Sequence, residues 1–185
     1  LLCCCVAFAI GQEFKRKTFA HWVNPKQIVA SLLGKILLYV LIFCAWTCCW
    51  MFWLAHIRGY FIAGSLSLIL AAQFLLYFSY AVISSTVVLA TKNLPKTFGF
   101  IALYGGSSPS FSGITLPLNN APAFTQFWSM IIPYTPYAKL QTEQWVIGSD
   151  LYISLLPFGI LVIFSGLYFA LSVRLLKKNA LELSQ

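Results

Sequence analysis

The chain has 185 residues, of which 60% are hydrophobic and only 9% are charged, and its formal net charge is +8. A soluble domain is typically about 45–50% apolar and about 25% charged, and a chain of this length has too little interior to bury so much apolar surface. The composition therefore excludes an ordinary soluble domain and predicts an all-α integral membrane protein, a polytopic helical bundle.

The first ten residues, LLCCCVAFAI, form an apolar run that is too short to cross a bilayer, which takes about 20 residues. They lack the cationic start and the small-residue cleavage site of a signal peptide. We expect residues 1–10 to be the tail of a span that begins upstream, in a longer protein.

Residues 11–35 form a polar, basic segment between two apolar runs. Asn24 and Pro25 predict the start of a helix that runs into the next span, with Lys35 at the interface. Before them, aromatic residues alternate with cations, which is typical of a short helix in the headgroup plane. The segment is either an orientation anchor or a docking surface for a partner.

Four full spans follow in the prediction. They are residues 36–55, 60–91, 98–113 and 151–173. The second is about 48 Å long as a helix, so it must tilt or extend beyond the lipid. The third is weaker, because Gly105, Gly106 and Pro109 interrupt it.

Residues 114–150 are too apolar for a solvated loop. Asn120 and Pro122 predict the start of one short helix, and Pro136 predicts a second that ends near Gly148. Two short helices around a proline turn indicate a re-entrant or interfacial hairpin, since irregular backbone is tolerated at membrane depth only within protein or beside a water-filled cavity. It is either an outer gate or a cover on the membrane surface.

Basic residues are distributed unevenly between the two sides of the predicted bundle. One side holds Lys15, Arg16, Lys17, Lys26, Lys35, Lys92, Lys96, Arg174, Lys177 and Lys178. The other side holds only Arg58 and Lys139. Cytoplasmic loops carry the excess of Lys and Arg, so we predict that residues 11–35 and the tail 174–185 are cytoplasmic. Cations beside apolar spans suit anionic lipid headgroups better than nucleic acid.

Catalytic and cofactor motifs are absent from the sequence. The four acids, Glu13, Glu143, Asp150 and Glu182, fall at predicted ends or in loops, so no ionisable group at depth offers ion coupling. There is no phosphate-binding glycine loop, and the six cysteines form no zinc-type ligand set. We expect no catalytic residue, metal or cofactor in this chain, and an energy source elsewhere.

One polar stripe lies within the second span. Gln73, Tyr77, Tyr80 and Ser84 fall at i, i+4, i+7 and i+11, on one helix face. Such a face contacts protein or a pathway rather than lipid. Helix packing and lining of a substrate pathway both remain open.

Two motifs lie on opposite predicted sides of the bundle. The first comprises Gly11, Glu13, Thr18, Pro25, Gly34 and Lys35, entering the next span. The second comprises Ser112, Gly113, Pro117, Pro122, Pro133, Pro136 and Gly148. In this order the two motifs resemble the ABC type-2 permease family, the membrane subunits of ABC exporters. The family commonly has glycine where Lys17 stands here.

The resemblance implies a coupling helix within residues 11–35, with Trp22 among its contacts, that touches a separate ATP-hydrolysing subunit holding ATP and magnesium. The outward hairpin would close the exit, and a second permease copy, identical or not, would complete the route for a drug-like, lipid or glycan substrate. Membrane lipids and a periplasmic adaptor are further expected partners. The implied location is the inner (plasma) membrane, with several crossings and a cytoplasmic C-terminus.

Two other functions remain open. One is a membrane-embedded enzyme acting on lipid-linked substrates, for which Lys139, Glu143 and Asp150 are the outward candidates. The other is a non-transporting membrane assembly protein.

Overall fold

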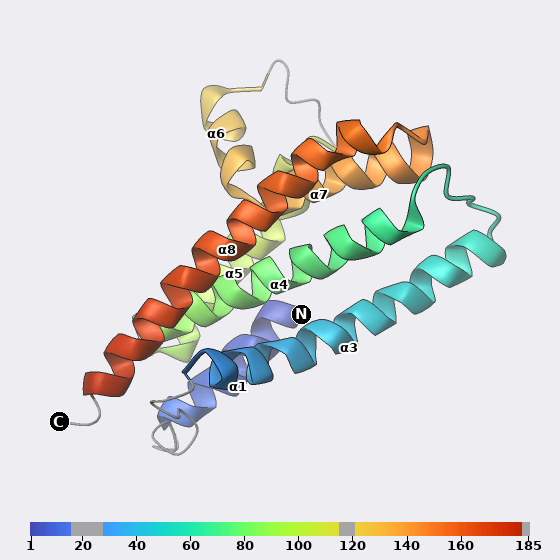
Figure 1. The fold of residues 1–185 in the computed structure, drawn as a ribbon. Helices are drawn as coiled ribbons and strands as arrows, with labels where there is room; N and C mark the ends of the chain where they lie inside the picture. The colour runs from blue at the N-terminus through green and yellow to red at the C-terminus, as the bar shows by residue number, and fades with distance from the viewer. Residues whose placement is uncertain (16–27, 115–120, 183–185) are drawn as a thin grey trace.

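The computed structural model describes residues 1–15, 28–114 and 121–182, and all regular secondary structure in these ranges is helical (Figure 1). The elements are α1 (Leu2–Lys15), α3 (Ile28–His56), α4 (Leu66–Thr91), α5 (Leu94–Phe111), α6 (Ala123–Ile131), α7 (Tyr134–Gln141), a π-helix η1 (Thr142–Ile147) and α8 (Leu151–Glu182).

Three of the described helices, α3, α4 and α8, are long and apolar enough to cross a membrane. The chain is therefore a multi-pass helical membrane protein. Helix α5 is not among the three: its 18 residues span about 27 Å, just short of a typical hydrocarbon core of about 30 Å. Its second half contains the polar run from Gly105 to Ser110. A fourth crossing through residues 98–113 stays a prediction.

Helix α3 is continuous from Ile28 to His56, so the end of the basic segment and the following apolar run form one helix. Helix α4 begins at Leu66, six residues after the predicted start of its span. Ser65 caps it, because its hydroxyl accepts a hydrogen bond from the Leu68 N–H (3.5 Å).

The turn between α4 and α5 is built from local signals. Lys92 ends α4 in the left-handed region (φ 50°), and its N–H bonds to the carbonyl of Val88. Asn93 then caps α5 by accepting a hydrogen bond from the Lys96 N–H (3.2 Å), with Pro95 in the first turn.

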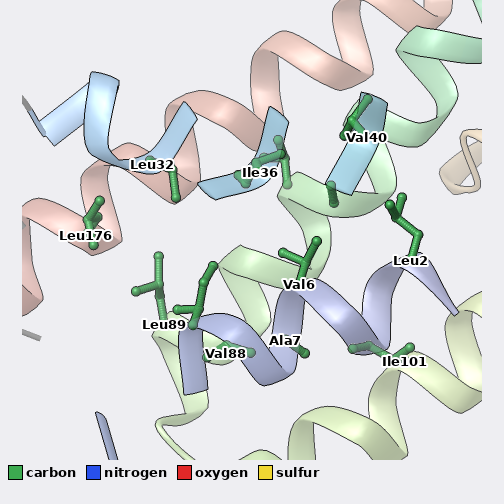
Figure 2. Packing of buried hydrophobic residues seen from close by; sticks show 13 residues of the cluster. Leu2, Val6, Ala7, Leu32, Ile36, Val40, Val88, Leu89, Ile101 and Leu176 are labelled. Carbon is green, nitrogen blue, oxygen red and sulfur yellow. The ribbon is translucent and has the colours of Figure 1, made fainter. Parts of the chain in front are cut away.

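Helix α4 lies at the centre of the bundle and packs against α8, α1, α3 and α5 (Figure 1). Figure 2 shows the main core, to which five helices contribute. Val6 of α1, Ile36 of α3, Leu89 of α4, Ile101 of α5 and Leu176 of α8 all lie in this cluster. The described ends of α1 and α3 are thus held by a shared core.

Small and polar side chains allow α4 and α8 to approach closely. Ser79 and Ser165 share a hydrogen bond of 2.8 Å and are both buried. The amide of Asn179 donates to the backbone carbonyl of Leu89 (2.9 Å). Small and hydroxyl-bearing residues are typical of helix contacts within membranes.

Helices α6, α7 and η1 form a hairpin that enters the bundle and returns. Near its tip, Ile132 packs against Ile83 of α4, about 26 Å along that helix from Leu66. On the return, Tyr137 packs against Leu76, closer to the start of α4. The hairpin therefore reaches past the middle of α4 before it turns back.

Candidate functional site

Cations gather at one end of the described bundle, where α1 ends, α3 begins, α4 turns into α5 and α8 ends (Figure 1). We name it the basic end. The helices and the turn there carry Lys35, Lys92, Lys96, Arg174, Lys177 and Lys178. Arg58 follows α3 at the opposite end, and Lys139 lies in the hairpin. The fold thus brings together loops that the charge pattern assigns to one side.

Two residues of the predicted coupling motif meet at the basic end. The carboxylate of Glu13, near the end of α1, forms an ion pair with the ammonium of Lys35, about two turns into α3. Their side chains are 23% and 22% exposed, so the pair is partly shielded from water. The ion pair joins the two helices that flank the middle of the basic segment.

The two glycines of the motif have different surroundings. A Cβ on Gly11 would lie 2.3 Å from Cδ2 of Leu94, so this glycine lets α1 pack closely against α5. A Cβ on Gly34 would have no atom of the described residues within 4 Å, and the residue is exposed on α3. In the described part of the chain, Gly11 has a packing role, whereas Gly34 leaves an open surface. Thr18, Trp22 and Pro25 lie outside the described residues.

Each member of the polar stripe on α4 bonds to a different helix. The hydroxyl of Tyr137 in α7 donates to Gln73 Oε1, and Tyr77 shares a hydrogen bond of 2.5 Å with Thr47 of α3. Tyr80 donates to Ser108 of α5 (2.6 Å). The fourth member, Ser84, donates to the Cys3 carbonyl of α1 (2.6 Å). The stripe therefore ties α4 to its neighbours, and its role in a pathway stays a prediction.

The predicted gate residues lie along the hairpin and at its entry. Ser112 ends α5 and its hydroxyl donates to the Pro109 carbonyl (2.7 Å), and Gly113 follows with φ 82°. Pro133 is buried at the turn between α6 and α7, and Pro136 is buried in the first turn of α7. Pro122 precedes α6 and is exposed, and Pro117 lies outside the described residues.

A buried glutamine at the end of the hairpin was not anticipated from the sequence. Gln144 in η1 is 0% exposed, and its Oε1 accepts the N–H of Ser65 at the start of α4 (2.8 Å). Its Nε2 donates to the Ser149 carbonyl (2.9 Å) and to Ser154 Oγ of α8 (3.0 Å). Its backbone carbonyl accepts the N–H of Gly64 (2.8 Å). One side chain thus joins α4, the hairpin and α8.

Two glycines make this junction possible. A Cβ on Gly64 would lie 2.4 Å from Gln144 Oε1 and 2.9 Å from its carbonyl oxygen. Gly148 adopts φ +71° at the end of η1, a backbone conformation that favours glycine, and a Cβ there would lie 3.0 Å from the Cβ of Ala63. Gly148 was expected at the end of the hairpin, whereas the contribution of Gly64 depends on a contact distant in sequence.

The two outward acids considered for an enzyme, Glu143 and Asp150, differ in their burial. Glu143 is buried and accepts a hydrogen bond from Ser154 Oγ (2.7 Å), and its other oxygen is 4.0 Å from the ammonium of Lys139. Asp150 is exposed at the start of α8. Within the described ranges, no group of three or more His, Cys, Asp or Glu residues is placed to hold a metal ion.

Comparison with known proteins gives one family match. The model of the family described as ABC-2 family transporter protein matches residues 2–174, which is most of the chain. No curated protein and no solved structure matches.

Proposed function

Because the chain belongs to the ABC-2 family of transporter proteins, whose members are membrane permeases of ABC transporters, we propose that it forms the membrane pathway of an ATP-driven exporter. In this proposal the ATP is hydrolysed by a separate nucleotide-binding subunit, which also holds the magnesium. The cargo is a drug-like, lipid or glycan molecule. The protein lies in the inner (plasma) membrane with its basic end and C-terminus in the cytoplasm.

The Glu13–Lys35 ion pair is the observation that best supports the proposed coupling contact. It joins α1 to α3 on either side of the segment proposed to meet the ATPase. A force applied to that segment would therefore reach both helices together rather than one alone. The shared core beneath the pair then connects both helices to α4.

The hairpin is proposed as the outward gate. Its tip at Ile132 reaches Ile83, past the middle of α4, and this depth supports a re-entrant element over a surface cover. The junction around Gln144 anchors its far end to α4 and α8. Such an element can block the route from the outside while remaining attached to the spans.

A second permease copy would complete the route. On α5, Leu103 is 75% exposed, and a Cβ on Gly99 or Gly106 would have no atom of the described residues within 4 Å. Open glycines beside exposed apolar side chains suit close packing of another helix in the membrane. This face supports a permease dimer.

Substitution of Glu13 by Gln or Thr18 by Val tests the proposal in reconstituted permease and ATPase. We expect membrane insertion to persist while ATP hydrolysis by the partner is uncoupled from export. Gly159→Ala in α8 is a matched control, because a Cβ there would have no atom within 4 Å. Unchanged coupling in both the Glu13 and the Thr18 variants would contradict the proposal.

A further inference from the structure

A groove with a cavity volume of about 340 Å³ lies between the hairpin and α8. Its apolar walls include Met130 of α6 and Leu156, Ile160 and Phe164 of α8. Leu156 and Ile160 are 67% and 39% exposed, although α8 is a candidate span. With α8 crossing the membrane, the groove would open toward the surrounding hydrocarbon.

The polarity of this groove changes along its length. Helix α7 runs toward Gly148 and α8 runs away from it, so Lys139 and Leu156 lie at similar separations from that junction. Phe164 lies two turns further along α8. One end of the groove thus contains Lys139 and lies toward the end of the bundle opposite the basic end. The other end is apolar and lies nearer the middle of α8.

Lys139, the cation at one end of the groove, has only a weak ion pair among the described residues. The side chain of Lys139 is 62% exposed, and its ammonium is 4.0 Å from Glu143 Oε1, the limit for an ion pair. The other oxygen of Glu143 accepts a hydrogen bond from Ser154 (2.7 Å), which fixes the carboxylate toward α8. Lys139 therefore retains donors for an additional anion.

Thr135 supplies a second polar group on the same wall. Its hydroxyl oxygen is buried and has no hydrogen-bond partner among the described residues. A buried hydroxyl without a partner costs free energy. Rotation of the Thr135 side chain toward the groove would let the hydroxyl donate to a carbonyl oxygen of a ligand there and would remove that cost.

We propose that this groove binds an anionic phospholipid of the surrounding bilayer, in the leaflet remote from the basic end. The phosphate lies at Lys139, and one acyl chain runs along Leu156, Ile160 and Phe164. An ester carbonyl accepts from Thr135 once its side chain has turned toward the groove. The charge complementarity and the polar-to-apolar order of the groove select this ligand over a detergent-like hydrocarbon alone. The site would anchor the hairpin to the bilayer, and it does not depend on ATP coupling.

Native mass spectrometry of the full-length permease tests the site. The protein is equilibrated with anionic and zwitterionic phospholipids of identical acyl chains, and the retained lipids are counted. We expect wild type to retain the anionic lipid in preference, and Lys139→Gln to reduce that preference about fivefold, since a lysine near an anionic surface contributes about that factor.

Arg58→Gln is the matched control. Arg58 is the other cation of the outward side, but it stacks 5.3 Å above the ring of Trp53 and does not line this groove. We expect the Arg58 variant to retain the wild-type preference. Ile160→Trp, which fills the groove without a change of charge, should reduce retention of both lipids.

Three results would overturn the proposal. They are an unchanged preference in Lys139→Gln, an equal loss in Arg58→Gln, and full lipid retention in Ile160→Trp. Thermal unfolding of each variant establishes that it is folded. If the Lys139 variant is misfolded, the comparison of Ile160→Trp with Arg58→Gln decides the test, because Ile160 lines the groove and Arg58 does not.

Discussion

Glu13 and Lys35 lie 22 residues apart in the chain, yet their side chains form an ion pair that joins the end of α1 to the beginning of α3. The pair is about four-fifths buried and lies above a core shared by α1, α3 and α4. The proposed coupling segment is therefore held at both ends within a single chain.

A charge swap tests this connection. Glu13→Lys and Lys35→Glu should each weaken coupling between ATP hydrolysis and export, because each places like charges side by side. The double variant should recover part of the loss, with an interaction free energy of about 0.5–3 kcal/mol in a double-mutant cycle on thermal unfolding. Strictly additive effects of the two substitutions would show that the pair does not act as a unit.

The two glycines of the coupling motif should respond differently to alanine. Gly11→Ala places a methyl group against Leu94 and should lower thermal stability, because either the Leu94 side chain or α1 must shift. Gly34→Ala meets no atom within 4 Å among the described residues, and should leave stability equal or higher by up to about 1 kcal/mol.

A loss of coupling in Gly34→Ala at unchanged stability would then favour a contact of this surface with a partner. ATPase assays with and without cargo, run beside thermal unfolding, separate these cases. A strongly destabilised Gly34 variant would be inconsistent with the open surroundings of this residue.

Gln144→Leu should destabilise the outward end of the bundle. The substitution leaves the N–H of Ser65 without its acceptor, and a shielded N–H without a partner costs about 1–3 kcal/mol. Ser154 loses the hydrogen bond from Gln144 but keeps its own bond to Glu143. Gln141→Leu, one turn earlier and only half-buried, is the control and should change stability little. Thermal unfolding in detergent would measure both, and equal stability of the two variants would contradict the role of the junction.

Tyr80→Phe distinguishes packing from pathway lining in the polar stripe. Loss of the hydrogen bond to Ser108 should lower the free energy of unfolding by about 0.5–1.5 kcal/mol, and Ser108→Ala should add little further loss. The packing interpretation predicts unchanged cargo selectivity in transport assays. Altered selectivity with unchanged stability would instead favour a pathway-lining role.

Much of the architecture could be predicted from local sequence patterns. Apolar runs and the family resemblance indicated a multi-pass helical permease, and the family match confirms the resemblance. The turn at Lys92–Pro95 also follows from local signals, since Asn93 and Pro95 are ordinary helix-start residues. Such features depend on composition and short-range capping, which a single sequence reveals.

The contacts between distant residues at the two ends of the bundle could not be predicted from local patterns. The residues from Tyr60 to Ala63 are as apolar as a span, but the chain there remains non-helical and pairs with η1: the N–H of Ala63 bonds to the Trp145 carbonyl (3.2 Å). Gln144 has no pattern that marks it as buried. Both features depend on contacts about 80 residues apart, which neither periodicity nor capping records. Polar residues of α8 at seven-residue spacing, Ser165, Ser172 and Asn179, are buried and were an available signal for its packing face.

The orientation of the bundle is tested most directly by labelling single cysteines with a membrane-impermeant maleimide in intact cells. In a variant lacking the six native cysteines, we expect Arg58→Cys and Asp150→Cys to react from outside. Lys96→Cys and Lys177→Cys should react only after the membrane is permeabilised. Reaction of Lys96→Cys and Asp150→Cys from the same side of the intact membrane would contradict the layout, and with it the proposed contact between the basic end and an ATPase.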